Sequence, residues 1–290
     1  MKKEMFYVAV LLFCSACDKE ADYIAEERVP IMLGTTIEAA GAETRTQSTT
    51  LQNTELASGQ AVGVFIYNAG TKATQTTYGG YKNISYSVSG TAGDLTSSTQ
   101  PYYPANASQT VDIYAFSPRE AYTATNADLS GLTAVTGYSV NTDQSSDAGY
   151  KASDFVWGTG SSSAAAVKPL SDKKVLVTLG HKMSRIIVRL TEGNGMSGRL
   201  AGATVKINNV VVATKINLTT GVVEPTGSTQ SAVTLGSNIS VSSGKATCIG
   251  VIPPQSIAAC GLITITLSDT YGNSVYTYTT TAASTFTANN

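Results

Sequence analysis

The chain has 290 residues and a formal net charge of −1, from 19 basic and 20 acidic residues. Only 13% of the residues are charged and no basic stripe stands out, which argues against a nucleic-acid partner, because phosphate binding needs clustered lysines and arginines. Threonine, serine, glycine, valine and tyrosine predominate between the charges, and long amphipathic helical patterns are absent. This composition predicts an all-β fold.

Residues 1–17 have the pattern of a lipoprotein signal peptide. Two lysines precede a short apolar run, Met5–Phe13, which is too short to span a bilayer as a mature helix. Small residues then lead into Cys17, and this arrangement predicts an acylated Cys17. Cys14 stands where an aliphatic residue is commoner. A plain signal peptide is one alternative, and a redox Cys-x-x-Cys pair is another, although that motif belongs at the head of a helix in a folded domain.

Alternation of apolar and polar residues predicts the strands of the first half. Residues 18–28 are charged and weakly patterned, and we interpret them as a tether. The segments Glu38–Gln60 and Ser117–Tyr150 are rich in turns and are predicted to be loops. The predicted strands are Val29–Leu33, Ala61–Tyr67, Asn83–Ser89 and Val111–Phe116, with Gln100–Pro104 as an edge strand or extended loop.

The second half opens with a kinked strand, Val175–Leu190. Apolar residues alternate up to Leu179, and the alternation resumes on the other parity at Ile186. A change of parity inside a strand pattern predicts a bulge or kink, here within Gly180–Arg185. Further short strands follow at Ala203–Ala213, Thr214–Leu218 with Val222–Val223, Ala246–Ile252, Leu262–Ser268 and Ser274–Thr280.

Length and strand spacing together predict two domains in tandem. A chain of 290 residues suits two domains of about 100–150 residues each. Evenly spaced short strands with turn signals between them predict a β-sandwich in each. The N-terminal sandwich is expected at residues 29–160 and the C-terminal one at residues 173–290. Residues 161–172, with small residues before them, are the predicted linker.

His181, the only histidine, lies at the predicted kink. A metal site needs clustered ligands, which one histidine and scattered acids do not supply. A Ser-His-Asp triad would need His181, yet no Gly-x-Ser-x-Gly elbow presents a nucleophile. We therefore interpret His181 as a residue that caps a bend or hydrogen-bonds a buried carbonyl, and we expect no catalysis, metal or cofactor.

Cys248 and Cys260 are placed symmetrically about Pro254. A hairpin that turned at Pro254 would bring them opposite each other, close enough for a disulfide that a secreted protein could keep. Two buried thiols that act as small apolar side chains are the alternative. The spacing alone does not choose between them.

A series of short motifs resembles the fimbrillin family of Bacteroides-type surface pili over nearly the whole chain. After the lipoprotein signal come a Thr-Arg segment, the strand Gly59–Tyr67 and the motif VDIYAFSP. SDFVWG, LGHKMSRIIV, INLTTGVV and the turn IPPQ follow in that order. The resemblance implies two transthyretin-like sandwiches, and it implies precursors that reach the outer membrane surface as lipoproteins. It also implies that an arginine-specific protease removes the first strand and that a neighbouring subunit's strand fills the groove.

Arg45 is the cleavage site that this resemblance suggests. It lies in a polar segment between the predicted strand Val29–Leu33 and the strand that begins at Ala61, where a protease could reach it. Cleavage there would release the first strand and leave a chain that begins at Thr46. Arg28 is the competing site, but cleavage at Arg28 would keep the strand. An exposed loop arginine without this role is the other interpretation.

The expected function is that of a non-enzymatic structural or adhesive pilus subunit whose partners are other fimbrillin subunits. The alternative is a monomeric, lipid-anchored glycan-binding module. Residues after Phe286 have no period-2 apolar face, so they offer no pocket-filling side chains to a neighbour. A subunit that accepts a strand but donates none would lie at the tip of a fibre. A truncated reading of the gene would leave the same C-terminal sequence.

Overall fold

A computed structural model of the chain describes residues 28–38, 55–70, 81–90, 93–122, 135–167, 173–195, 197–268 and 274–288. Strands dominate these ranges, so the predicted all-β class is confirmed. The signal segment 1–17, residues 18–27 of the expected tether, and Arg45 lie outside the described residues. The tandem transthyretin-like architecture stays a prediction.

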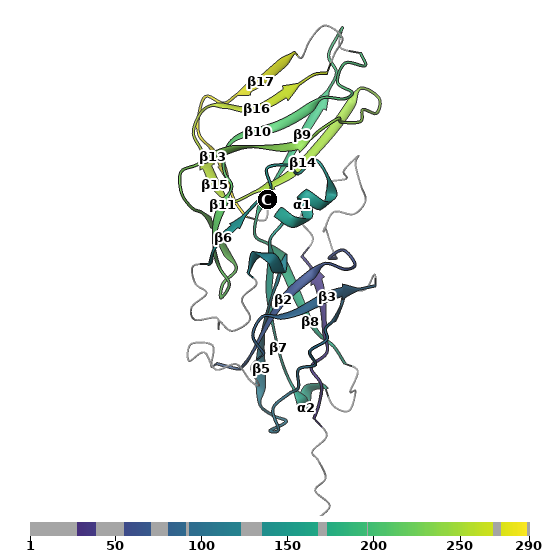
Figure 1. Cartoon of the computed structure of the whole chain (residues 1–290), viewed down its shortest axis with the longest axis vertical. Coiled ribbons are helices and arrows are strands. Elements are labelled where there is room, and N and C mark those ends of the chain that lie inside the picture. The colour runs from purple at the N-terminus through teal and green to yellow at the C-terminus, as the bar shows by residue number, and fades with distance from the viewer. Residues whose placement is uncertain are drawn as a thin grey trace, which may run out of the picture.

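Seven strands close into a barrel, which forms the lower part of the molecule in Figure 1. Around the barrel they follow the order β1-β4-β3-β2-β5-β7-β8. Their bounds are β1 (Leu33–Ile37), β2 (Ala61–Asn68), β3 (Ile84–Ser89), β4 (Asp94–Thr96), β5 (Thr110–Ser117), β7 (Val156–Ser163) and β8 (Val175–His181). The sequence predicted a β-sandwich here. The difference arises because β1 hydrogen-bonds to β4 on one side and to β8 on the other, which joins the two edges.

The barrel interior is the first of three apolar cores. Alternation along β3 places Ile84, Tyr86 and Val88 inside, while Ser85 and Ser87 are exposed, as the sequence predicted. The short helix α2 (Ala164–Val167) adds buried side chains to the same core, and it lies at the lower end of the barrel in Figure 1. The interior is thus filled with side chains, as in other small barrels.

The upper part of the molecule contains four smaller sheets, with strand orders β13-β10-β16-β17, β12-β11-β6, β14-β9 and β15-β18. The strands are β6 (Val135–Ser139), β9 (Ser184–Thr191), β10 (Thr204–Val211), β11 (Ala213–Asn217), β12 (Val222–Pro225), β13 (Gln230–Gly236), β14 (Lys245–Ile252), β15 (Gln255–Ile257), β16 (Gly261–Thr266), β17 (Val275–Thr279) and β18 (Ser284–Phe286). Apolar side chains from β10, β13, β14 and β16 share one core, so this half is built as a sandwich.

The path of the chain does not follow the predicted division into two consecutive domains. β6 precedes the barrel strands β7 and β8, yet it pairs with β11 in the upper part. The predicted linker, residues 161–172, is preceded by β7 and followed by β8, and both strands belong to the barrel. Residues 161–163 are themselves the end of β7, paired with β5. The chain therefore returns to the barrel after β6 and leaves it after His181.

The predicted kink in Val175–Leu190 marks this second crossing. β8 ends at His181 and β9 begins at Ser184, so the prediction of two strand halves with a break between them is confirmed. The two halves serve different sheets: β8 pairs with β1 in the barrel, and β9 pairs with β14 above it. The change of parity places Leu179 in the barrel core and Ile186 in the upper core.

A third apolar core joins the barrel to the upper part. It contains Phe65 and Phe116 from the outer face of the barrel, and Ile216 and Ile249 from the upper strands. Between them lies helix α1 (Asp147–Ser153), which packs against β14 and is capped at its N-terminus by the side chain of Ser146. The sequence predicted only loop in this region. The helix is too short to leave a clear period-3.6 pattern.

Candidate functional site

Strand β1 is the element whose pairing determines whether the barrel is closed. It runs parallel to β8 over five residue pairs, from Leu33 with Val175 to Ile37 with Leu179. On its other side it runs antiparallel to β4, with Leu33 opposite Leu95. Among the described barrel strands this is the only parallel pairing. β1 therefore occupies a slot between two strands that are not paired with each other.

Alternate residues of this segment fill the slot from one end to the other. Ile31, Leu33, Thr35 and Ile37 are 1%, 1%, 2% and 6% exposed, and they point into the barrel core. Burying one large apolar side chain contributes about 1.5–3 kcal/mol. The three aliphatic side chains together contribute on the order of 5–9 kcal/mol, which is comparable with the entire stability of a typical domain, about 5–15 kcal/mol. An empty slot would thus be strongly unfavourable.

The predicted first strand, Val29–Leu33, begins four residues before β1 and overlaps it only at Leu33. Its residues are extended but pair with a different partner: the Ile31 N–H donates to Pro101 O at 2.9 Å, and the Tyr103 N–H donates to Val29 O at 2.9 Å. Only an isolated bridge forms, between Pro30 and Tyr102, since Pro30 has no N–H to donate. The segment Gln100–Pro104 acts as the extended edge that the sequence predicted.

Further backbone hydrogen bonds hold β1 along its length. The Thr35 N–H donates to Gly93 O at 2.8 Å, the Val175 N–H to Met32 O at 2.8 Å, and the Glu38 N–H to Leu179 O at 2.9 Å. These groups would need new partners if β1 left, because buried backbone groups without partners are costly. Any replacement would have to be another extended chain.

A small pocket opens to the surface beside β1. Its volume is about 140 Å³, and buried Ile31, Leu33, Tyr86 and Leu95 line it together with exposed residues such as Thr99. Tyr86 is 4% exposed, and its hydroxyl has no hydrogen-bond partner among the described residues. Burial raises the pKa of Tyr86 above its ordinary value, and the nearby Tyr81 adds to the shift. β1 therefore leaves the buried hydroxyl of Tyr86 without a hydrogen bond to any described residue.

His181 is buried and contacts a carboxylate. Its Nδ1 lies 2.9 Å from Oδ1 of Asp154, and these side chains are 9% and 1% exposed. Asp154 is the residue that ends α1, so the pair links α1 to the end of β8 where the chain leaves the barrel. The sequence predicted a bend-capping role or a bond to a carbonyl. His181 does lie where β8 ends and the chain bends towards β9, and its side-chain partner is the carboxylate of Asp154.

Cys248 and Cys260 are not joined by a disulfide. Cys248 lies on β14 opposite Val188 of β9, whereas Cys260 precedes β16, which pairs with β10 and β17. The segment between the two cysteines carries the chain from one sheet to another, so the two residues do not face each other across a hairpin about Pro254. Cys248 is fully buried in the upper core, and Cys260 is partly exposed at its edge.

The remaining predicted sites lie at or beyond the limits of the described ranges. Cys17 and Arg45 are outside them, so lipidation and cleavage stay predictions, whereas Arg28 is described and exposed. In the described part of the chain, no group of three or more His, Cys, Asp or Glu could hold a metal ion. The same part contains no helix that is long and apolar enough to cross a membrane.

The sequence did not predict β1 beyond Leu33. Gly34 was interpreted as the end of the first strand, although the alternation of Ile31, Leu33, Thr35 and Ile37 continues past it. If glycine and threonine had been accepted within the alternating pattern, the sequence would have predicted that the strand continues to Ile37. The parallel partner β8, about 140 residues away, left no such signal.

Comparison with known proteins agrees with this architecture. The profile of a family described as fimbrillin-like matches residues 44–290. A candidate cell adhesion protein of known structure from Bacteroides uniformis is 20% identical, with a TM-score of 0.57 over 89% of this chain and 88% of that one. Another from Bacteroides ovatus is 17% identical, with a TM-score of 0.60 over 90% and 89%. No match is found among curated proteins. The two structures share their fold with this chain.

Proposed function

Because this chain belongs to the fimbrillin-like family, we propose that it is a structural or adhesive subunit of a cell-surface fimbrium, assembled by donor-strand exchange. Proteolysis after Arg45 would separate β1 from the rest of the chain, and an extended segment of another subunit would take its place. The role needs no catalysis. The partners are other fimbrial subunits, and an acylated Cys17 would hold the precursor at the outer membrane until cleavage.

The observation that carries this proposal is the position of β1. The strand completes the barrel with about 5–9 kcal/mol of apolar burial, yet it precedes every other described strand and pairs with partners on both sides. A single cut between residues 38 and 55 would detach it without breaking any other described strand. Strand addition then uses main-chain hydrogen bonds for affinity and alternate side-chain pockets for specificity.

Cleavage and assembly can be tested with the chain that lacks residues 1–17. Digestion with an arginine-specific protease should give a product that begins at Thr46 and forms ladders on a non-boiled gel. Arg45→Ala should stay uncleaved and monomeric, while the control Arg28→Ala should still be cut and assemble. A product that begins at Val29 and assembles would contradict the proposal, because it would retain β1.

The vacated slot can be tested independently of fibre formation. A synthetic peptide of residues 29–38, added during digestion, should occupy the slot and suppress the ladders. A control peptide of the same length, with Leu33 and Ile37 each replaced by aspartate, should not suppress the ladders, because the barrel core cannot accept those charges. Ladders that are equally insensitive to both peptides would mean that subunits associate through another surface.

The lipid anchor has its own test. Mass spectrometry of the membrane-associated precursor should detect an acylated N-terminus at Cys17, and Cys17→Ala should release the protein from the membrane. A free, unacylated N-terminus at another residue would contradict anchoring through Cys17 and leave the assembly proposal intact.

A further inference from the structure

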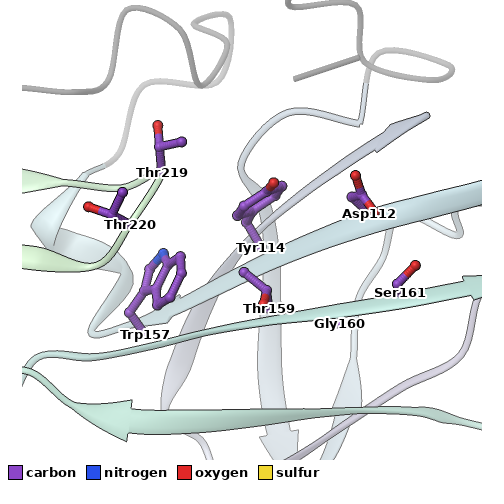
Figure 2. A pocket seen from close by; sticks show the side chains of 8 residues that line it. All are labelled: Asp112, Tyr114, Trp157, Thr159, Gly160, Ser161, Thr219 and Thr220. Carbon is purple, nitrogen blue, oxygen red and sulfur yellow. The ribbon is translucent and has the colours of Figure 1, made fainter. Parts of the chain in front are cut away.

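A groove of about 600 Å³ lies on the outer face of the barrel, shown in Figure 2. Its floor comes from β5 and β7, and one wall comes from the turn between β11 and β12, at Thr219 and Thr220. Sites for small ligands usually have volumes of about 300–1,000 Å³. The groove is distinct from the β1 slot, so its role is separate from the proposed strand exchange.

Strand pairing places two rows of side chains side by side on this floor. Tyr114 of β5 is opposite Thr159 of β7, and Asp112 is opposite Ser161. The alternate residues of β5, such as Ile113, point into the barrel core instead. The outer face is therefore aromatic near the upper part of the molecule, and it becomes polar further along the same two strands.

The aromatic end is held rigidly. The Trp157 Nε1–H donates a hydrogen bond of 2.8 Å to Leu218 O, which ties the indole to the β11–β12 turn. Gly221, with φ of 74°, lies so close that a Cβ there would be 2.6 Å from the indole ring. The Tyr114 ring lies 6.4 Å from the indole, with 45° between their planes. Asn217 Oδ1 accepts the Thr219 N–H at 2.9 Å and fixes the turn itself.

The polar end offers hydroxyl groups and one carboxylate. Thr159, Ser161 and Thr220 are exposed, and Figure 2 shows Thr159 and Ser161 in line along β7. Asp112 Oδ2 accepts the Gly70 N–H at 3.1 Å, while its other oxygen makes no hydrogen bond to any described residue. Asp112 is also the only charged residue among the described residues that line the groove. Asp112 would repel an anionic ligand at this end of the groove, whereas Lys182 Nζ lies 5.3 Å from the centroid of the Trp157 ring at the other end.

We propose that this groove binds a neutral saccharide. Sugars present apolar C–H surface and many hydroxyl groups, which match the partly exposed indole of Trp157 at one end and hydroxyl and carboxylate acceptors at the other. The second carboxylate oxygen of Asp112 would accept hydrogen bonds from sugar hydroxyls. The hydroxyl groups of Thr159 and Ser161 would donate hydrogen bonds to other sugar hydroxyls or accept hydrogen bonds from them. A fixed aromatic end reduces the entropy lost on binding.

Trp157 is the only tryptophan of the chain, so its fluorescence reports directly on the groove. The test titrates the uncleaved, monomeric chain lacking residues 1–17 with methyl glycosides of glucose, galactose, mannose and N-acetylglucosamine, and with sialyllactose as an anionic probe. At least one neutral glycoside should change the fluorescence saturably, with a Kd on the order of 1 mM. Saturation-transfer NMR should detect the same sugar.

Matched variants localise the effect. Asp112→Asn should weaken binding about tenfold or more, because a charged acceptor is replaced by a neutral one. Thr159→Tyr, on an exposed position, should fill the groove and abolish binding. The control Asp143→Asn, which makes the same chemical change at an exposed turn of the upper part, should leave the affinity unchanged.

Three outcomes would overturn the saccharide proposal: no response to any neutral glycoside, a response to sialyllactose alone, or binding that survives in both Asp112→Asn and Thr159→Tyr. None of them bears on fibre assembly, because the assay uses monomeric, uncleaved protein.

Discussion

Tyr86 is a residue that would favour the proposed replacement of β1 by another strand. Its hydroxyl is buried beside β1 and lacks a partner among the described residues, next to the 140 Å³ pocket. A buried hydroxyl without a hydrogen bond costs about 1–3 kcal/mol. The cost applies as long as the resident strand occupies the slot, and an incoming strand with a polar side chain at this position would remove it.

Tyr86→Phe should therefore stabilise the uncleaved precursor by about 1 kcal/mol, because it deletes the unpaired hydroxyl and keeps the ring. It should also change the alkaline pH dependence. The folded-state pKa of Tyr86 is raised, so above pH 10 the unfolded chain releases this proton while the folded chain keeps it. Stability then falls with rising pH, by up to about 1.4 kcal/mol per pH unit for this group.

Urea unfolding of the parent and Tyr86→Phe at pH 7, 9, 10 and 11 measures both effects. The variant should be more stable at pH 7 and should lose less stability between pH 10 and 11. Equal losses of stability in the two proteins would show that the raised pKa of Tyr86 does not cause the fall in stability above pH 10.

The two cysteines give a second prediction at this scale. In the chain lacking residues 1–17, a maleimide should modify Cys260 in the native state and Cys248 only after unfolding, since Cys248 is fully buried. Mass spectrometry should count one adduct in the native protein and two in urea, without reductant. Cys260→Ser should remove the native adduct. A count of none in urea would indicate that the thiols are oxidised to a disulfide.

Among the elements, β1 shows what sequence patterns can and cannot provide. Sequence patterns correctly indicated β2, β3 and β5. In β3 the apolar residues face a core and serines lie between them, whereas β2 and β5 are buried on both faces. The same patterns ended the first strand too early at Gly34, and they missed β7, whose Gly-Thr-Gly-Ser-Ser-Ser run resembles a linker. Gly158 is needed inside the strand because a Cβ there would be 2.0 Å from Thr178 O. The close approach of β7 and β8 therefore requires small residues, and these give β7 the composition of a linker.

The contribution of β1 can be measured with a matched pair of substitutions. Leu33→Ala should destabilise the uncleaved chain by about 2–5 kcal/mol, because Leu33 is 1% exposed in the barrel core. Leu176→Ala removes the same atoms from the adjacent strand β8, where the side chain is 61% exposed, and should cost less than about 0.5 kcal/mol. Thermal and urea unfolding measure both variants. Similar losses would indicate that β1 contributes little to the barrel.

At the scale of the whole molecule, the two crossings of the chain make the barrel and the upper part interdependent. Composition correctly indicated an all-β fold, but a linear division of the chain could not reveal that β6 pairs with β11 in the upper part. Residues 135–153 carry too little periodicity to be assigned, since β6 is short and α1 has only seven residues. Their positions follow from a shared core that includes Tyr138, Tyr150 and Phe155.

That shared core predicts cooperative unfolding, which depends on Phe155. Phe155 is 0% exposed, and its ring lies 6.2 Å from the rings of both Phe116 of the barrel and Tyr138 of β6. Phe155→Ala should cost about 3–5 kcal/mol. Because the lost contacts join the two halves, the single calorimetric transition of the parent should separate into two, with a van't Hoff enthalpy below the calorimetric one.

Phe286→Ala is the matched control, since Phe286 packs only against the edge of the upper core and is partly exposed. It should lower the transition temperature slightly and leave one transition. Two transitions in the parent protein, or a single one retained in Phe155→Ala, would mean that the shared core does not couple the halves. If the coupling holds, loss of β1 from the barrel would also weaken the upper part, and a donated strand would stabilise the entire subunit.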